Sequence, residues 1–393
     1  MRILMISDVY FPRINGVSTS IQTFRDSLND LGHKVTLIAP DYGVRYNDQP
    51  YTIRVGARKV VLDPEDRFMH IRELRTLGRS LSPRQYDLVH IQTPFLAHYF
   101  GVAMANAMDV PCVETYHTYF EEYLYNYVSF LPRSVLRGLA RRFSRSQCNA
   151  LDAVVVPSRP IAQVLRDYGV RRPIHIIPTG VDDSQLPPGD GARFRANFGI
   201  SPERPTLVHV GRIAHEKNID FLLRALVEVA GRCPDVLLII AGEGPARTHL
   251  EALAARLGLR RNVLFVGYLS RDQQLSDCYC AGQGFVFASR TETQGLVLLE
   301  AMALGVPVVS TAALGTHDIL DAGQGALVAQ EDPADFSAKV LSLLEDAELR
   351  ARLAAEGQSY VREWSPQAMT ARLCECYDQV LTGAPQPCAA PVD

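Results

Sequence analysis

Two glutamates eight positions apart lie in a segment that suits the binding of a phosphorylated sugar. Glu292 and Glu300 begin and end the run Glu-Thr-Gln-Gly-Leu-Val-Leu-Leu-Glu, in which Gly295 marks the expected start of a helix. The first backbone N–H groups of a helix have no partner within it and favour an anion. Carboxylates fit beside such an anion when they accept hydrogen bonds from hydroxyl groups, which sugars and ribose both carry. The spacing alone is weak evidence, but the whole segment predicts a site for phosphate and hydroxyl groups.

Two basic residues come directly after an apolar run in the second half of the chain. Arg212 and Lys217 lie in Gly-Arg-Ile-Ala-His-Glu-Lys-Asn, between the strand expected at 206–210 and a helix expected near Asn218. Cations at the carboxyl end of a parallel strand are well placed to bind a diphosphate. Taken alone, the same residues fit a solvated charged loop equally well.

The first half of the chain offers two further candidates. Asn15 and Gly16 come just before the first helix, where a glycine lets a ligand approach the backbone closely. An Asn-Gly pair is also a common turn. His117 follows directly on an expected strand, at the edge of the sheet where doubly wound folds bind their ligands. A single histidine at such a place is often structural.

Short apolar runs alternate with helical patterns along both halves of the chain. After the first run, five apolar residues from Val17 to Leu31 recur at helical spacing, and Gly32 ends the helix. Near-continuous apolar strands separated by helices indicate parallel sheets covered on both faces. The expected strands are 2–7, 34–39, 87–92, 112–116, 153–157 and 174–178 in the first half, and 206–210, 236–241, 262–266, 284–288 and 306–310 in the second.

This pattern predicts an α/β protein of two doubly wound, Rossmann-like domains that face each other across a cleft. The segment 182–205 has several prolines and glycines and no long apolar run, so it marks the boundary. The expected domains are 1–182, which would bind the acceptor, and 183–365, which would bind the donor. A helix at 366–382 is expected to pack back toward the first domain, and 383–393 to form a tail.

Composition and missing motifs exclude several classes of protein. With 47% hydrophobic residues the 393-residue chain can fill its cores, and its formal charge of -3 argues against a general nucleic-acid binder. The turn after the first strand has a single glycine, Gly16, so it lacks the dinucleotide motif Gly-x-Gly-x-x-Gly. The first residues do not read as an export signal, and the eight cysteines form no ligand-like set. Reduced thiols in the cytoplasm are therefore expected.

The motifs together resemble those of one enzyme family over nearly the whole chain. Asn-Gly-Val at 15–17, Gly-Arg-x-x-x-Glu-Lys-Asn at 211–218 and Glu-x7-Glu at 292–300 are similar to the motifs of the retaining glycosyltransferases of family 4, which have the GT-B fold. The resemblance implies a nucleotide-sugar-dependent hexosyltransferase, with a UDP-hexose as the expected donor substrate and no cofactor.

The resemblance also implies roles for particular residues. Arg212 and Lys217 would hold the diphosphate, Glu300 the ribose hydroxyls and Glu292 the donor sugar. His117 would form a hydrogen bond with the sugar near the acceptor. The other residues expected to bind the donor are Gly16, Gly242, Gly244, Tyr268, Gln294, Gly295 and Leu296.

The chain contains no Asp-x-Asp triplet, the usual carboxylate pair for a metal-bound diphosphate. We therefore expect Arg212, Lys217 and the helix start at Gly295 to stabilise the leaving diphosphate without a metal. A double displacement needs a carboxylate nucleophile, and the sequence nominates none firmly, Glu292 included. The resemblance implies instead a reaction on one face of the sugar, in which the departing phosphate helps to deprotonate the acceptor.

A basic segment bears on the identity of the acceptor. Residues 131–147 contain five arginines and no acid, and on a helical wheel the arginines lie opposite an apolar half. This pattern fits an anionic membrane surface and an ordinary domain helix equally well. The preceding stretch 116–130, with five tyrosines and two phenylalanines, resembles bacterial diacylglycerol glycosyltransferases of the same family. The residues expected to meet the acceptor or the membrane are Tyr116, Tyr119, Arg137, Arg141 and Arg145.

The sequence thus predicts transfer of a hexose to a membrane lipid hydroxyl, with diacylglycerol as the expected acceptor. The enzyme would be cytoplasmic and peripheral on the inner face of the cell membrane. Its expected partners are a nucleotide sugar, a lipid acceptor and an anionic membrane surface, and no nucleic acid. Two alternatives stay open: transfer to a soluble or polyprenol-linked glycan, and epimerisation of a sugar nucleotide by a GT-B enzyme, which would need no acceptor.

Overall fold

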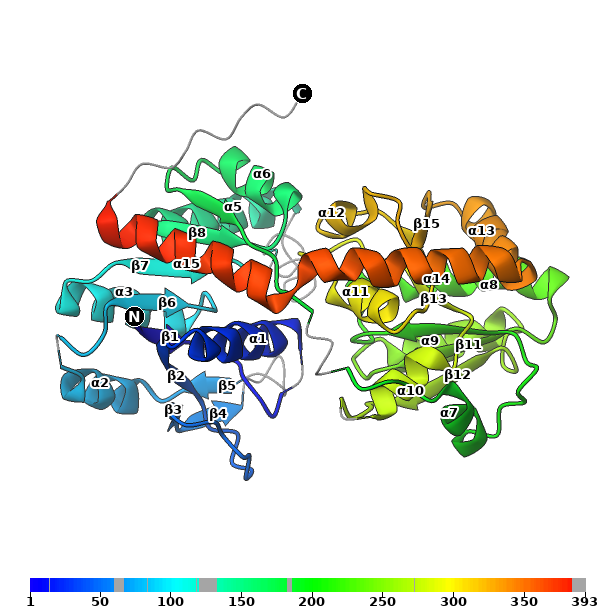
Figure 1. Ribbon diagram of the computed structural model, residues 1–393, viewed down its shortest axis with the longest axis horizontal. Helices are drawn as coiled ribbons and strands as arrows, with labels where there is room; N and C mark the ends of the chain where they lie inside the picture. Colours follow the sequence, from blue (N-terminus) through cyan, green and yellow to red (C-terminus); the bar gives the residue numbers. More distant parts are fainter. Residues whose placement is uncertain are drawn as a thin grey trace. The chain divides into compact units, whose positions relative to one another are not determined.

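The computed structural model describes residues 1–13, 15–59, 67–82, 84–117, 119, 133–181, 186–271 and 273–383. The chain divides into two compact units, each built around its own parallel sheet (Figure 1). Unit 1 is Met1–Gly180 together with the segment that starts at Pro366, and unit 2 is Val181–Ser365.

Unit 1 contains a seven-stranded sheet in which every pairing is parallel. Its strand order is β3-β2-β1-β6-β7-β8-β9, so the order of connection reverses between β1 and β6, the switch point of a doubly wound sheet. The strands are β1 (Arg2–Ile6), β2 (Lys34–Pro40), β3 (Thr52–Val55), β6 (Leu88–Ile91), β7 (Cys112–Thr115), β8 (Ala153–Val156) and β9 (Ile174–Ile176).

Helices cover both faces of this sheet. On one face α1 (Gly16–Asp30) and the C-terminal helix α15 (Pro366–Thr382) lie side by side and both pack against the sheet (Figure 1). Tyr377 of α15 reaches the sheet, where its hydroxyl oxygen is 2.7 Å from Nδ1 of His90. Residues of α3 (Leu96–Met108), α5 (Arg133–Asn149) and α6 (Arg159–Asp167) join the apolar core on the other face. α2 (Ile71–Ser80) packs against α3.

Unit 2 repeats this plan with six parallel strands in the order β12-β11-β10-β13-β14-β15. They are β10 (Thr206–Val210), β11 (Leu237–Ala241), β12 (Val263–Gly267), β13 (Gly284–Phe287), β14 (Val308–Thr311) and β15 (Ala326–Ala329). One face is covered by α8 (Ile219–Arg232), α9 (Arg247–Arg256) and α13 (Pro333–Glu345). The other carries α10 (Gln274–Cys280), α11 (Leu296–Ala303), α12 (Thr316–Leu320) and α14 (Ala347–Val361).

The expected strands are present, with ends that shift by one or two residues. Four further strands were not expected, namely β3, β15 and the antiparallel pair β4 (Ala57–Lys59) and β5 (Arg67–Met69). β3 and β15 are edge strands, and three of the four residues in β3 are only partly buried. An edge strand is paired on one side only, so it need not carry the continuous apolar run by which a central strand is recognised.

The segment 182–205, in which the sequence places the domain boundary, contains a helix in its described part. Its described part belongs to unit 2, where α7 (Gly191–Asn197) packs against α10. Gly189 does not mark flexibility, because a Cβ atom there would lie 2.2 Å from the carbonyl oxygen of Ser276. The glycine is needed for a close backbone approach. The two compact units divide between Gly180 and Val181, and the described residues from 186 to 205 pack as part of unit 2.

Candidate functional site

The loops that follow β10, β11 and β12 in unit 2 are joined by backbone hydrogen bonds. These bonds run from Gly211 N to Ala241 O (3.0 Å), from Gly242 N to Gly267 O (2.8 Å) and from Ile213 N to Glu243 O (2.9 Å). The loop that carries Arg212 is therefore fixed against its neighbours, at the edge of the sheet where doubly wound folds bind ligands.

Two glycines allow this close contact of loops. Gly242 has a φ of 134°, and a Cβ atom on it would lie 1.9 Å from the carbonyl oxygen of Gly211. A Cβ atom on Gly244 would lie 2.3 Å from the carbonyl oxygen of Ile213. Both positions thus have a packing reason to be glycine, whether or not the backbone there also meets a nucleotide.

Lys217 and Glu292 form an ion pair across this edge of the sheet. Lys217 ends a short 3-10 turn, His215–Lys217, after β10, and Glu292 lies in the loop after β13. Asn218 fixes the turn, because its side chain donates to the carbonyl oxygen of Ala288 at 3.2 Å. The ammonium group and the carboxylate predicted for the diphosphate and the sugar are therefore adjacent.

Arg212 also has an acidic neighbour. Its NH1 atom is 3.9 Å from Oε1 of Glu216, one helical turn further on, and both side chains are partly exposed. Arg212 and Lys217, the two residues predicted to bind the diphosphate, therefore each lie next to a carboxylate of unit 2. Within the described residues, no group of three or more His, Cys, Asp or Glu side chains could hold a metal ion.

The helix α11 starts where the sequence predicts an anion site. Gly295 precedes it with a φ of 100°, and among the described residues no side chain caps the helix start. A Cβ atom on Gly315 would lie 1.9 Å from the carbonyl oxygen of Thr293, and Gly315 N donates to Glu292 O at 2.9 Å. The loop after β14 thus supports the loop that carries Glu292, Gln294, Gly295 and Leu296. The backbone N–H groups at this helix start can donate hydrogen bonds to a phosphate.

Glu300 lies inside α11 and is 5% exposed. Its Oε2 atom accepts a hydrogen bond from the Tyr279 hydroxyl (2.9 Å), and its Oε1 atom accepts one from Arg271 NH2 (2.5 Å). Burial and the Glu300 charge raise the pKa of Tyr279 well above its usual value, so the hydroxyl stays protonated and donates. Sequence reasoning missed Arg271 and Tyr279, because neither belongs to a recognisable motif.

Tyr268 follows directly on β12 and is 58% exposed. The turn is made by Gly267, which has a φ of 76°. An exposed aromatic ring offers a flat surface on which a nucleotide base could stack, which is the role predicted for this position.

His209 in β10 is a buried histidine that sequence reasoning did not select. Nδ1 lies 3.0 Å from the carbonyl oxygen of Val286 and donates to it, so Nε2 is an acceptor. Nε2 has no hydrogen-bond partner among the described residues. Burial lowers the pKa of His209 to about 4, and the ring is therefore neutral at pH 7.

In unit 1, Asn15 caps α1, because its side-chain oxygen accepts a hydrogen bond from Ser18 N at 2.8 Å. Gly16 is the first residue of this helix, and a Cβ atom on it would meet no atom within 4 Å among the described residues. Packing within unit 1 therefore gives no reason for a glycine here. The open space beside Gly16 leaves room for a ligand to approach the helix start.

His117 follows β7, next to the end of β6. Its Nε2 atom is 3.1 Å from the side-chain oxygen of Gln92, and burial lowers the pKa of His117 to about 4. Behind it, Nε2 of His90 is 2.8 Å from the Thr115 hydroxyl oxygen. A neutral imidazole suits hydrogen bonding to a sugar hydroxyl, as predicted, and could not serve as a cationic partner for phosphate at pH 7.

Asp8 joins the end of β1 to the start of α3. Its carboxylate accepts hydrogen bonds from the Thr93 hydroxyl (2.9 Å) and from Ala97 N (3.1 Å to Oδ2). Burial raises the pKa of Asp8 to about 6, against the effect of these hydrogen bonds. The residue therefore caps α3 from a neighbouring strand, a structural role that keeps this edge of the sheet in place.

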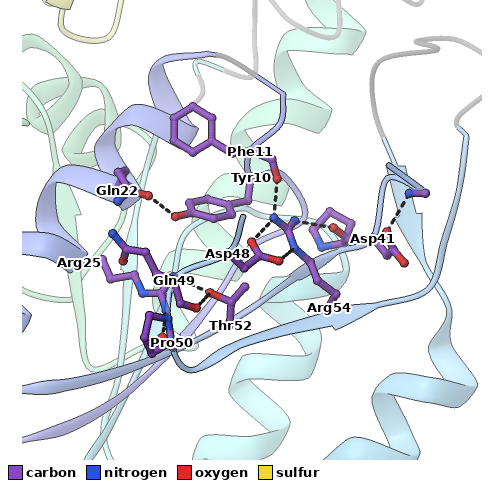
Figure 2. Close-up of polar contacts among 12 residues, drawn as sticks. Tyr10, Phe11, Gln22, Arg25, Asp41, Asp48, Gln49, Pro50, Thr52 and Arg54 are labelled. Carbon is purple, nitrogen blue, oxygen red and sulfur yellow. Dashed lines mark hydrogen bonds and ion pairs between the residues drawn. The ribbon is translucent and has the colours of Figure 1, made fainter. Parts of the chain in front are cut away.

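A polar network holds the segment around Phe11 that follows β1 (Figure 2). Arg54 donates to the carbonyl oxygen of Phe11 (2.7 Å) and to Asp48 (2.6 Å to Oδ1). Arg25 is fully buried and donates to the Thr52 hydroxyl at 2.8 Å. These contacts join distant segments, so no local sequence pattern predicts them.

Helix α5 contributes to both the core and the surface of unit 1. Leu136 and Ala140 are buried, whereas Val135 and Leu139 are 46% and 53% exposed. The apolar half expected from the helical wheel is thus divided between core and solvent. The exposed surface, which we call the α5 face, consists of Val135, Arg137, Leu139, Arg141, Arg142 and Arg145.

The tyrosines expected to meet the membrane are placed differently. Tyr116 is buried, with its hydroxyl oxygen 2.9 Å from that of Ser144 in α5, and Tyr119 packs against the core of unit 1. This placement does not support direct contact of Tyr116 with lipid. Residue 118, the stretch 120–132 and the side chain of Arg133 lie outside the described residues. No helix in the described part of the chain has the length and hydropathy to cross a membrane.

The sequence of each unit matches a family of sugar-transferring enzymes. Residues 14–185 match the family described as Glycosyltransferase Family 4, and residues 190–360 match that described as Glycosyl transferases group 1. The alpha-monoglucosyldiacylglycerol synthase of Streptococcus pneumoniae is 31% identical over 322 residues, which are 79% of this chain and 71% of that protein. The sulfoquinovosyl transferase SQD2 of Arabidopsis thaliana is 29% identical over 392 residues, which are 94% and 72% of the two chains.

A solved structure is similar over almost the whole fold. HepE of Anabaena, crystallised in complex with UDP-glucose, superposes with a TM-score of 0.75 at 17% identity and covers 96% of this chain and 100% of its own. The likeness in fold and the matches to both units confirm the predicted GT-B fold and the predicted family. The chain belongs to glycosyltransferase family 4 and is a nucleotide-sugar-dependent hexosyltransferase.

Proposed function

We propose that this protein transfers a hexose, with retention of configuration, from a UDP-hexose to the hydroxyl group of diacylglycerol. The observation that carries the lipid acceptor is the α5 face, where two exposed apolar side chains lie among arginines. The names of two relatives support it, since one is a monoglucosyldiacylglycerol synthase and the other a sulfoquinovosyl transferase. HepE, which was crystallised with UDP-glucose, supports a UDP-linked donor.

The donor binds to the edge of the sheet in unit 2. Arg212, Lys217 and the helix start at Gly295 bind the diphosphate, and Glu300 accepts hydrogen bonds from ribose. Glu292, released from Lys217 by the incoming phosphate, accepts hydrogen bonds from the sugar. Charge that develops on the leaving diphosphate is stabilised by groups already in place, which is the most effective form of electrostatic catalysis.

Retention follows from a reaction on one face of the sugar. The acceptor oxygen forms a bond to the anomeric carbon while the bond from that carbon to the phosphate oxygen breaks. The acceptor proton passes to an oxygen of the departing diphosphate, so no carboxylate nucleophile is required. His117, neutral at pH 7, forms a hydrogen bond with the sugar and orients it.

The membrane supplies the acceptor. The arginines of the α5 face interact with anionic lipid headgroups, and Val135 and Leu139 enter the headgroup region. The enzyme is then peripheral on the inner face of the cell membrane, in the cytoplasm, where nucleotide sugars are available. Membrane contact comes from α5, since Tyr116 is buried.

An acceptor screen tests this function. Radiolabelled UDP-glucose, UDP-galactose and GDP-mannose are each incubated with the purified protein and vesicles that contain diacylglycerol, with Lys217→Ala as the inactive control. We expect label from a UDP-hexose in an α-linked glycosyl diacylglycerol. A β-linked product would contradict retention. Label only in polyprenol-linked or soluble glycans would contradict the lipid acceptor, and conversion of the sugar nucleotide without acceptor would indicate an epimerase.

A further inference from the structure

The carboxylate of Glu300 is bound by side chains from two different elements. Tyr279, on α10, is fully buried and donates to Oε2 at 2.9 Å. Arg271 lies in the loop between β12 and α10 and donates to Oε1 at 2.5 Å. Within the described part of the chain, these are the two hydrogen bonds that the carboxylate accepts from side chains. Each carboxylate oxygen therefore accepts one hydrogen bond from a side chain.

Counting acceptor positions shows what the carboxylate can still bind. An ionised carboxylate offers about four lone-pair positions, two on each oxygen. Tyr279 and Arg271 occupy one on each oxygen, so one remains on each oxygen, on the same rigid group. The 2′- and 3′-hydroxyl groups of a ribose are on adjacent carbon atoms, so each can donate a hydrogen bond to one oxygen of the same carboxylate.

We propose that Tyr279 and Arg271 are positioning residues that orient the Glu300 carboxylate to accept both the 2′- and the 3′-hydroxyl of the donor ribose. Through this orientation they make the enzyme select ribonucleotides over 2′-deoxyribonucleotides. This inference rests on the proposed function, because it takes Glu300 as the ribose ligand.

The same contacts could simply fasten α10 to α11, and two observations favour the positioning role. The Arg271 side chain is 25% exposed, so this ion pair reaches the solvent-accessible surface and is not sealed inside the core. Arg271 also shares its loop with Tyr268, the exposed aromatic residue expected to meet the base. The loop that meets the base thus also orients the group that meets the ribose.

Removal of either hydrogen-bond donor, Tyr279 or Arg271, should therefore affect nucleotide binding more than the rate of the chemical step. In Tyr279→Phe the Oε2 atom loses its donor, and the terminal torsion of a glutamate is soft, so the carboxylate can rotate. We expect the donor KM to rise about tenfold with kcat nearly unchanged, the pattern for a contact made equally in ground and transition states. Arg271→Gln should behave similarly, and Arg271→Lys, which keeps a cationic donor, should recover part of the loss.

The decisive experiment compares ribo- and deoxyribonucleotides as ligands. Calorimetry measures the affinity of UDP, 2′-deoxy-UDP, GDP and 2′-deoxy-GDP for the full-length wild type and for Tyr279→Phe, Arg271→Gln and Arg271→Lys. Tyr360→Phe is the matched control, since Tyr360 is also a buried tyrosine of unit 2 and its hydroxyl group donates to Asp318 O at 3.5 Å. Thermal unfolding of each variant reports whether it is folded.

The wild type should bind the ribonucleotide about ten- to a hundredfold more tightly than its 2′-deoxy counterpart, since one buried hydrogen bond is lost. Tyr279→Phe should bind the ribonucleotide more weakly and reduce this ratio to a few fold, whereas Tyr360→Phe should retain it. An unchanged ratio in a folded Tyr279→Phe and Arg271→Gln would overturn the inference and leave the proposed function intact. Failure of the wild type to bind either ribonucleotide would instead contradict the proposed donor site.

Discussion

Lys217 and Glu292 form an ion pair that joins the loop after β10 to the loop after β13. Both side chains are about four-fifths buried, so water shields the pair only in part. A diphosphate that binds Lys217 must compete with Glu292 for the ammonium group. The carboxylate released in this exchange can accept a hydrogen bond from the sugar. In the proposed donor site, the pair would therefore couple the binding of the diphosphate to that of the sugar.

Loss of either cation should impair use of the donor strongly. In Lys217→Ala and Arg212→Ala a charged contact to the diphosphate disappears, which should cost about 2–4 kcal/mol, or roughly 30- to 1000-fold in kcat/KM. Lys217→Ala should be the more damaging, because Glu292 then stays unpaired next to the phosphate. Initial rates with saturating acceptor measure the effect, and Lys339→Ala, which removes an ion pair on α13, is the control. Loss of activity in EDTA that a divalent ion restores would contradict a metal-free site.

The two glutamates should differ in which kinetic constant they change. Glu300→Gln should mainly raise the donor KM, because ribose is bound in both the ground and the transition state. Glu292→Gln should mainly lower kcat, because the sugar to which it binds carries the breaking bond. Steady-state kinetics over a range of donor concentrations separates the two. Interchangeable kinetics would mean that this division of roles is wrong.

Motif residues could be predicted from the sequence, and their partners could not. Arg212, Lys217, Glu292 and Glu300 stand at recognisable spacings in loops and helix starts after apolar strands. Arg271 and Tyr279 contact Glu300 from positions 29 and 21 residues away, and neither carries a local signal. Only the fold brings such pairs together.

The fold itself was predictable where burial dictates the residue type. Central strands such as β11 are continuous apolar runs, because helices cover both faces. Edge strands such as β3 are short and partly exposed, so they lack this signal. The packing role of a glycine is also hidden in the sequence: Gly189 lies in the segment that marks the domain boundary, and only the structure shows that it permits a tight contact with Ser276.

The substitution Gly16→Ala should lower the activity of the enzyme without lowering its stability. No described atom lies within 4 Å of the position of its Cβ, so Gly16→Ala fits the fold and should leave the melting temperature unchanged or slightly higher. The methyl group would occupy the space through which the ligand approaches the helix start, and kcat/KM should fall about tenfold or more. Gly231→Ala, at an equally open helical position in unit 2, should leave both quantities unchanged. Full activity of a stable Gly16→Ala would exclude close approach of a ligand there.

His209 should make unit 2 sensitive to acid. Its folded pKa of about 4 is lower than that of an exposed histidine, about 6.5, so the unfolded chain takes up a proton first. Stability is therefore unaffected at pH 7 and is lost as the pH falls from about 6.5 toward 4, by about 3 kcal/mol in all. His209→Leu removes the titrating group, and its melting temperature should fall less over this range, as calorimetry from pH 7 to pH 4.5 would measure. Parallel pH curves for wild type and variant would show that the protonation of His209 is not linked to unfolding.

The riskiest prediction concerns the α5 face. If Arg137, Arg141 and Arg145 meet anionic lipid, each contributes about 1 kcal/mol near the surface, and this contribution decreases with salt. Replacing all three by glutamine should therefore weaken binding to anionic vesicles by about a hundredfold or more at low salt. Nucleotide affinity and melting temperature should change little, because the three side chains are exposed and belong to unit 1, whereas the proposed donor residues belong to unit 2.

A matched triple variant provides the control for this charge change. Arg72, Arg75 and Arg79 are exposed on α2 of the same unit, so their replacement by glutamine removes an equal charge from a different surface. Co-sedimentation of both variants and the wild type with vesicles at low and high salt distinguishes a specific face from general attraction. Equal losses in the two variants would mean that the vesicles respond to net charge alone. If neither variant binds the vesicles more weakly than the wild type, or if binding does not depend on salt, α5 is a packing helix and not a membrane contact. The lipid acceptor would then be supported by the relatives alone.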